Sequence, residues 1–435
     1  MQLHVENLGV IKSGDIDLDK NLIILAGPNN SGKSYLAYLV HGIESLFSLS
    51  GILKPFSQEA VFFKRIQDMV TSPPILTNSE LVKTEIIRSE LTNNFESILK
   101  LLNFQIENAA SLIFASNAIK PKVTVATSAN SKKISGLNYF EDTNIEFRHE
   151  ILSHFVRVNF EEILGFQSVF FYPAERTALN MLGKEVYKEK TMQSEIIGQK
   201  ILAGGDLNDI KATLLPRYSL AIRDYLFFVN DLDKLSQNTR QFSAFAEEIE
   251  QMLLKGKVSV NEYGDIKYTP TGSHSELDMH VSSSLVKSLS GLVLYFRHLA
   301  QVGDFIIIDE PEINLHPDNQ RIFARIIVKA VNLGFRVMLS THSDYITREL
   351  NNLIMLGSQS NDKTKDLTER YAYANDELLQ AEQVGVYIFD KGTICEEKVT
   401  EKGFAIREID KIIMEQNIAS DDIYNSLIEM QDEAD

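Results

Sequence analysis

Two hydrophobic patterns alternate along the chain and predict an α/β fold. Short apolar runs of strand length are found at residues 3–8, 14–18, 21–26, 167–172, 304–308 and 336–340. Apolar residues at helical spacing are found at 35–47, 285–300 and 319–333. Because a helix connects the strands at 304–308 and 336–340, those two strands should lie parallel in one sheet. We therefore predict an α/β domain with an N-terminal β-meander and a mostly parallel core sheet.

Two long stretches with helical patterns interrupt this α/β domain. The first is rich in Leu, Ile and Val at Glu80–Leu102 and carries one β segment at Lys122–Thr127. Neither stretch has the sustained heptads of a coiled-coil arm, so we expect an inserted helical lobe. The predicted units follow one another along the chain. They are a first segment of the α/β domain at 1–50, a helical insertion at 51–165, a strand that returns to the α/β domain at 166–180, a second helical insertion at 181–256, a second segment of the α/β domain at 257–356 and a C-terminal part at 357–435.

Turn signals predict two hairpins and one loop in the second half. One hairpin is expected at Lys257–Tyr268. A second is expected from Val384–Asp390 and Thr393–Val399, which flank Lys391-Gly392, with helices and an acidic tail after it. The polar segment Gly357–Lys365 predicts a flexible loop.

Residues 27–34 read GPNNSGKS, which matches the phosphate-binding pattern G-x-x-x-x-G-K-[ST] between a strand and a helix. Gly27 and Gly32 allow a tight turn that points backbone N–H groups at a phosphate chain. Lys33 would reach the β- and γ-phosphates, and the Ser34 hydroxyl would ligate Mg²⁺. The predicted nucleotide-binding residues are Gly27, Pro28, Asn29, Asn30, Ser31, Gly32, Lys33, Ser34 and Tyr35.

Two later strands end in side chains that suit nucleotide hydrolysis. The apolar run 305–308 ends in Asp309 and Glu310. Asp309 suits Mg²⁺, and Glu310 suits the orientation and deprotonation of a water. His342 follows the next strand and would contact the γ-phosphate or that water. The alternatives are two acids that merely end a strand and a hydrogen-bonded surface histidine. The predicted catalytic residues are therefore Lys33, Glu310 and His342.

The order of these motifs resembles the ABC-type ATPase heads of SMC, RecF and OLD (overcoming lysogenisation defect) proteins. Residues 309–317, DEPEINLHP, are similar to the D-E-P-E-x-x-L-H-P form of OLD-like and related AAA_15 and AAA_21 ATPases. The resemblance covers residues 1–45 and 280–356. It implies a P-loop ABC-ATPase head, ATP and Mg²⁺ as cofactors, and a composite site in a homodimer or higher homo-oligomer. It also adds Glu312 and His316 as candidate site residues.

Two weaker motifs follow from the same resemblance. Aligning on Lys287 places Ser283 and Ser284 at the signature that caps the γ-phosphate of the facing subunit. Both glycines and the acid of the family signature are replaced here, by Ser284, Leu285 and Val286. The alternative is that Ser282–Ser284 only caps a helix. Arg176, in a P-A-x-R motif, would reach phosphate or the facing subunit, or would be an ordinary salt-bridged arginine.

Composition narrows the class of protein. The 435 residues carry a formal net charge of −17, which argues against a surface that coats nucleic acid, although a local basic groove for DNA stays open. The single cysteine, Cys395, excludes an intramolecular disulfide and a cysteine-based zinc site. We expect a cytoplasmic protein without a membrane span or signal peptide. The acidic C-terminal end is either a solvated tail or a docking site for a basic partner.

The 93 residues after His342 contain no Asp-x-Asp, which the nuclease domain of OLD proteins requires, so we expect no nuclease in this chain. An ATPase without its own effector resembles the separate ATPase components of bacterial anti-phage systems such as PARIS or Septu. The leading hypothesis is an ATPase that senses infection and regulates a separate nuclease or toxin. The alternative is a RecF- or SMC-like DNA-binding ATPase in repair or maintenance.

Overall fold

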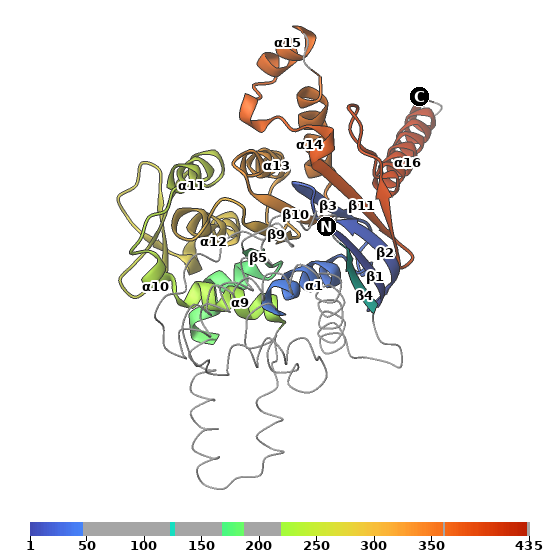
Figure 1. Ribbon diagram of the computed structural model, residues 1–435. Helices are drawn as coiled ribbons and strands as arrows, with labels where there is room; N and C mark the ends of the chain where they lie inside the picture. Colours follow the sequence, from blue (N-terminus) through green and yellow to red (C-terminus); the bar gives the residue numbers. More distant parts are fainter. Residues whose placement is uncertain (47–121, 127–167, 187–218, 360–361, 433–435) are drawn as a thin grey trace, which may run out of the picture.

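The computed structural model describes residues 1–46, 122–126, 168–186, 219–359 and 362–432. Within these residues a nine-stranded sheet forms the centre of the molecule (Figure 1). Its strands, in spatial order, are β4 (Lys122–Ala126), β1 (Gln2–Leu8), β2 (Ile11–Asp17), β12 (Thr393–Glu397), β11 (Val384–Asp390), β3 (Leu22–Ala26), β10 (Arg336–Thr341), β9 (Phe305–Asp309) and β5 (Val169–Tyr172). The predicted helix at Glu80–Leu102 lies outside the described residues.

The central part of the sheet is parallel, as predicted. Strand β3 pairs in parallel with β11 and β10, and β9 pairs in parallel with β10 and β5. The β1–β2, β1–β4 and β11–β12 pairs are antiparallel. The sequence-based β-meander needs one correction, because β3 does not follow β2 in the sheet. The C-terminal hairpin β11–β12 inserts between them, and the β segment inside the first insertion joins the head sheet as its edge strand β4.

Alternating side chains of the buried strands serve two cores, one on each face of the sheet. Ile23 and Leu25 of β3 pack with α1 (Lys33–Leu46), whereas Leu22 and Ile24 face the opposite core. That second core is covered by α12 (Ser284–His298), α13 (Pro317–Asn332) and α14 (Asp344–Gly357). Because both faces are covered, the central strands are apolar through their middle positions, which is typical of parallel sheets.

A smaller layer of helices and strands follows β5. It contains α9 (Leu220–Asn230), α10 (Leu232–Leu235), α11 (Ser243–Ile249), the π-helical η2 (Glu250–Leu254), and an antiparallel sheet of β6 (Gly256–Val260), β7 (Ile266–Pro270) and β8 (Leu277–Asp278). The predicted hairpin at 257–268 is thus confirmed, with a third strand added. The short 3-10 helices are η3 (Met279–Val281), η4 (Asn375–Glu377) and η5 (Ala381–Gln383).

The loop predicted at Gly357–Lys365 is wrong in its second part, because α15 (Asp362–Arg370) begins there. All of its residues except Leu367 are polar and none is buried, which is why the pattern resembled a loop. An Arg370–Asp366 pair at 3.0 Å and an acid in the first turn support this exposed helix. The last helix, α16 (Arg407–Asp432), stands at the C-terminal end (Figure 1).

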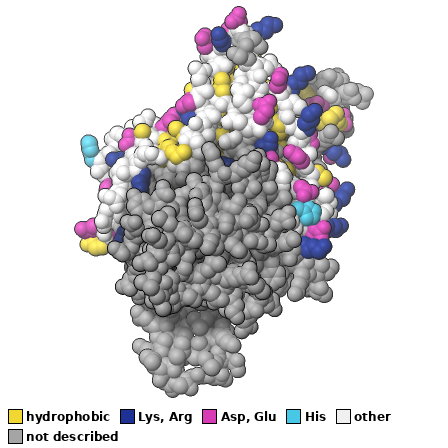
Figure 2. Space-filling view, viewed as in Figure 1, with side chains coloured by type: hydrophobic (Ala, Val, Ile, Leu, Met, Phe, Trp, Pro, Cys, Tyr) yellow, Lys and Arg dark blue, Asp and Glu magenta, His cyan; other side chains and the backbone are white. Residues whose placement is uncertain are grey.

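Charged side chains of both signs are interspersed on the described surface. On the face shown in Figure 2, the Lys and Arg side chains lie among Asp and Glu side chains and do not form one basic patch. Among the described residues, no helix is long and apolar enough to cross a membrane.

Candidate active site

The phosphate-binding loop connects the end of β3 to the start of α1, as the sequence predicted. Gly27 and Gly32 have φ values of 141° and 105°, and Asn30 has a φ of 60°. Only glycine adopts the first two conformations without strain. A Cβ on Gly27 would lie 2.5 Å from the carbonyl oxygen of Phe389 in β11. The C-terminal strand therefore packs directly behind the loop, and a side chain at position 27 would displace one of them.

Lys33 is held inside the loop that it completes. Its side chain is buried, and Nζ donates hydrogen bonds to the carbonyl oxygens of Gly27 and Pro28, both at 2.9 Å. Burial lowers the pKa of Lys33, while the carboxylates of Glu310 and Asp309 oppose that shift. The Ser31 hydroxyl, also in the loop, is buried without a hydrogen-bond partner among the described residues. The loop thus holds an ammonium group and an unsatisfied hydroxyl, both suited to phosphate oxygens.

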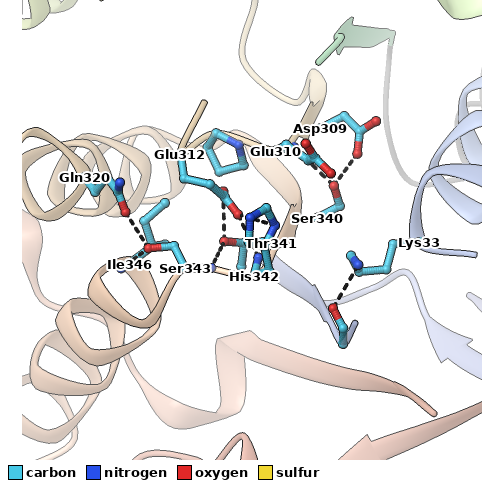
Figure 3. A network of polar contacts seen from close by, with 12 residues as sticks. Lys33, Asp309, Glu310, Glu312, Gln320, Ser340, Thr341, His342, Ser343 and Ile346 are labelled. Carbon is cyan, nitrogen blue, oxygen red and sulfur yellow. Dashed lines mark hydrogen bonds and ion pairs between the residues drawn. The ribbon is translucent and has the colours of Figure 1, made fainter. Parts of the chain in front are cut away.

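Asp309 stands at the carboxyl end of β9 and joins the loop to the neighbouring strand. Its Oδ1 accepts a hydrogen bond from the Ser34 hydroxyl at 3.2 Å. The Ser340 hydroxyl of β10 donates to the same oxygen, as Figure 3 shows. The parallel register, in which Ser340 lies opposite Asp309, brings these two side chains together. Burial raises the pKa of Asp309. The two residues predicted to bind Mg²⁺ are therefore in contact.

Glu310 occupies a special backbone position at the strand end. Its φ of 48° is left-handed, and its backbone N–H donates to the carbonyl oxygen of Ser340 at 3.0 Å and to the Ser340 hydroxyl at 3.2 Å. These bonds turn the chain sharply away from β9 and leave the side chain partly exposed. A carboxylate beside Asp309 with access to water is suited to activating that water.

Glu312 fixes the position of His342. The buried carboxylate accepts hydrogen bonds from the backbone N–H of His342 at 2.7 Å and from the Thr341 hydroxyl at 3.0 Å. It also lies 3.0 Å from Nδ1 of the His342 ring (Figure 3). This contact raises the pKa of His342. Burial alone would raise the pKa of Glu312, but the bonds from His342 bring it below its ordinary value.

Arg176 requires a correction. The predicted contact with phosphate or with a facing subunit is wrong, because the side chain is only 1% exposed. Its guanidinium donates to the carbonyl oxygens of Pro173 at 3.0 Å, Asp309 at 2.9 Å, Glu310 at 2.9 Å and Pro311 at 3.3 Å, and to the Ser288 hydroxyl at 3.0 Å. Arg176 thus holds the turn that carries Asp309 and Glu310, and burial lowers its pKa.

His316 also differs from the expectation. The side chain is exposed and caps α13, since Nδ1 accepts a hydrogen bond from the backbone N–H of Asp318 at 3.4 Å. The ring contacts found among the described residues are both to Asp318, one of them this bond and the other a 3.7 Å approach to its carboxylate. His316 therefore acts as a helix cap.

The predicted signature lies at the N-terminus of α12. The Ser283 hydroxyl accepts a hydrogen bond from the backbone N–H of Val286 at 3.3 Å, so the capping alternative describes this serine correctly. Ser283 and Ser284 are both exposed. Lys287 folds back, and its Nζ donates to the carbonyl oxygen of His280 at 2.9 Å. The role of these residues in a composite site stays a prediction.

Sequence reasoning missed the hydroxyl groups that organise the site. Ser340 bonds Asp309, Thr341 bonds Glu312, and the Ser343 hydroxyl donates to Gln320 Oε1 at 2.5 Å while capping α14. The available signal was the run of hydroxyl residues around His342 at the end of an otherwise apolar strand.

Comparison with known proteins agrees with this geometry. The AAA ATPase domain family matches residues 1–347. The chain belongs to this AAA ATPase domain family. The match includes the phosphate-binding loop, Asp309, Glu310 and His342 of this AAA ATPase domain, whereas no curated protein matches the chain.

Solved structures of SMC heads are similar to this AAA ATPase chain at low identity. The SMC head domain from Thermotoga maritima is 11% identical with a TM-score of 0.32, covering 92% of this chain and 98% of its own. An SMC head bound to the C-terminal winged-helix domain of ScpA is 10% identical with a TM-score of 0.36, and the match covers 92% of this chain and 98% of that one. A third structure is an SMC head with an extended coiled coil, bound to the C-terminal domain of ScpA from Pyrococcus furiosus. It is 12% identical with a TM-score of 0.34, and the match covers 96% of this chain and 98% of that one.

Proposed function

We propose that this chain binds ATP with Mg²⁺ and hydrolyses it at a composite site between two copies, and that this cycle regulates a separate effector protein. The observation that carries the proposal is the Ser34–Asp309 contact at 3.2 Å. Through this contact the phosphate-binding loop lies beside the strand end that carries Asp309 and Glu310. This is the edge of the parallel sheet where ligands of such sheets bind.

The residues fit a triphosphate with its cation. The backbone N–H groups of the loop and the start of α1 would hold the phosphates, together with the Lys33 ammonium and the Ser31 hydroxyl. The Ser34 hydroxyl and the Asp309 carboxylate are oxygen donors of the kind that Mg²⁺ prefers. Among the described residues no group of three His, Cys, Asp or Glu could hold a metal, so the phosphates and water would complete the coordination. Bound Mg²⁺ would neutralise charge on the phosphates.

Glu310 is the proposed general base. Glu310 follows Asp309 directly in the sequence, and its side chain is partly exposed. A base in this place accepts the proton of a water that attacks the γ-phosphate. His342, held by Glu312 from behind, presents its ring beside this water. Arg176 acts as a positioning residue, because it holds the backbone of this turn.

The exposed start of α12 supports a composite site. This helix has 15 residues, and the N-terminal serines Ser283 and Ser284 are exposed. A helix N-terminus with serine hydroxyls binds anions. ATP held between the loop of one copy and this helix of another would stabilise the closed pair, which is the differential binding that a switch requires.

Hydrolysis is tested by steady-state ATPase assays on Glu310→Gln. We expect nucleotide affinity to remain while turnover falls about 100-fold or more, because the variant keeps the shape of the side chain and loses the base. The control is Glu401→Gln, an exposed glutamate in the C-terminal part. Turnover unchanged in Glu310→Gln would contradict the assignment of the base.

The effector role rests on the resemblance to stand-alone ATPase components of defence systems. It is tested by isolating the protein together with the product of the neighbouring reading frame, and by assaying nuclease or toxin activity with and without ATP. A DNA affinity that depends on ATP and falls with salt, in the purified protein alone, would instead support the DNA-binding alternative.

A further inference from the structure

Helix α16 exposes an apolar stripe that the rest of the described protein does not cover. Ile412, Ile423 and Tyr424 are 62%, 61% and 66% exposed, although large apolar side chains are normally buried. The stripe also contains Ile413 and the exposed Ala419. We use the term apolar stripe for Ile412, Ile413, Ala419, Ile423 and Tyr424.

The stripe follows from helical geometry. At about 100° per residue, Ile412, Ala419 and Ile423 lie almost on one line along the helix. Ile413 and Tyr424 lie roughly 100° to 120° around the helix from this line, both on the same flank. The charged side chains of the same segment, Lys411, Glu415, Asp421 and Asp422, lie on the other side of the helix. Met414 and Ile418, which are 64% and 49% exposed, lie among these charges. The apolar stripe therefore lies on the one side of α16 that carries no charged residue among its described side chains.

The base of α16 is anchored while its length is exposed. Asn351 Nδ2 donates to the carbonyl oxygen of Phe404 at 2.8 Å, and the Phe404 N–H donates back to Asn351 Oδ1 at 2.9 Å. Asn351 belongs to α14, which begins at Asp344 just after His342. A helix of this kind gains most of its stability from packing of its apolar face, so a stripe left in water indicates a missing partner.

Charge decides which partner fits. The sequence of α16 has seven acidic and two basic residues, and the whole chain has a net charge of −17. Two copies of α16 would bring like charges together along the stripe, which opposes self-pairing. A basic surface would gain from the same charges.

We propose that α16 is a docking helix for a basic amphipathic helix of a partner protein. The partner would place its apolar face on the apolar stripe and its Lys or Arg side chains near Glu415, Asp421 and Asp422. The proposal rests on the proposed function, because it names the kind of surface that the regulated effector carries. Since α14 links the base of α16 to His342, docking and the ATPase site share one rigid element.

The test measures binding of two labelled synthetic peptides to the full chain by fluorescence anisotropy. One peptide is a helix-forming sequence of leucine and lysine heptads, and the other has glutamate in place of every lysine. We expect the lysine peptide to bind more tightly than the glutamate peptide, and less tightly at high salt. Equal binding of the two peptides would overturn the proposal.

Variants locate the binding surface. The double variant Ile412→Ser/Ile423→Ser should weaken binding of the lysine peptide about tenfold or more, because it removes the centre of the stripe. The matched control is Ile418→Ser, which removes an isoleucine that is 49% exposed on the charged side, and it should change the affinity less than about twofold. Asp421→Asn/Asp422→Asn should weaken binding while the stripe is kept. Unchanged affinity in the stripe variant would contradict the proposal.

Two further measurements separate the other outcomes. Light scattering measures whether the chain associates with itself in the absence of nucleotide. If the wild-type chain associates and the stripe variant does not, a second copy covers the stripe and the proposal is overturned. The ATPase activity of the stripe variant should equal that of the wild type. If the wild-type chain has no ATPase activity but still binds the lysine peptide, the proposed function fails and the docking surface stands.

Discussion

The carboxylate of Glu312 holds both the backbone and the ring of His342, at 2.7 Å from the backbone nitrogen and 3.0 Å from Nδ1. Glu312, which the sequence offered as a candidate site residue, is therefore a positioning residue for His342. It is the residue that aims the histidine at the end of the next strand. The same interaction raises the pKa of His342 and lowers that of Glu312.

Glu312→Gln should lower the pKa of His342. In the wild type, the raised pKa of His342 means that its stabilising contribution is fully present below its unfolded value of about 6.5 and is lost as the pH rises through the folded value. The contribution of Glu312 is present above its unfolded pKa and is lost as the pH falls through its lowered folded pKa. The Glu312–His342 pair therefore stabilises the folded protein most at a pH above the unfolded pKa of Glu312 and below the unfolded pKa of His342.

An NMR titration of the His342 ring measures this shift. We expect kcat of Glu312→Gln to fall about tenfold with little change in KM, because the histidine is misplaced and not removed. Glu262→Gln, at an exposed loop position, is the control. An unchanged His342 titration would show that the carboxylate does not set the protonation of the ring.

Arg176→Met should destabilise the fold and slow hydrolysis. The change leaves the carbonyl oxygens of Asp309, Glu310 and Pro311 without their buried donor, which should cost about 3 kcal/mol of unfolding free energy. Urea unfolding gives the stability, and ATPase assays give kcat and KM. Arg223→Met, a half-exposed arginine on α9, should change the stability much less. A fully stable Arg176→Met protein would contradict the positioning role.

Gly27→Ala should reduce ATP affinity strongly. A Cβ there would meet the Phe389 carbonyl oxygen at 2.5 Å, and the backbone φ is 141°. The matched control is Gly272→Ala, where φ is 78° and nothing lies within 4 Å of the added atom. The control should lose about 1 kcal/mol of stability through backbone strain alone and keep its ATP affinity. Calorimetric titration with ATP separates the two, and equal affinities in both variants would mean that β11 does not support the loop.

Local patterns in the sequence were sufficient for the parallel centre of the sheet and for the residues at its edge. Each central strand contains a continuous apolar run. Asp309 directly follows one run, and His342 follows another after Ser340 and Thr341, so their positions did not depend on distant contacts. The phosphate-binding loop likewise depends on two glycines and their immediate neighbours.

Long-range pairing could not be predicted in the same way. The insertion of β11 between β2 and β3 joins residues that are far apart in the sequence, and no local pattern records that register. Arg176 was misassigned for a similar reason, because an arginine that binds backbone carbonyls looks the same in sequence as one that binds phosphate. Helix α15 has a single apolar residue, Leu367, and no buried residue, so its pattern resembled a loop.

The most direct test of the composite ATP site is a mixing experiment with two inactive variants. Lys33→Ala removes the ammonium of the phosphate-binding loop. Ser283→Glu introduces a negative charge, which is favourable at the start of α12 but repels a triphosphate from the facing copy. In a mixed dimer, one site combines the intact loop of one variant with the intact α12 terminus of the other.

Each variant alone should show almost no ATPase activity. An equal mixture should recover about a quarter of the wild-type activity, because half of the dimers are mixed and each has one intact site of two. Recovery in the mixture would support the composite site. No activity in the mixture, with both variants folded, would contradict it.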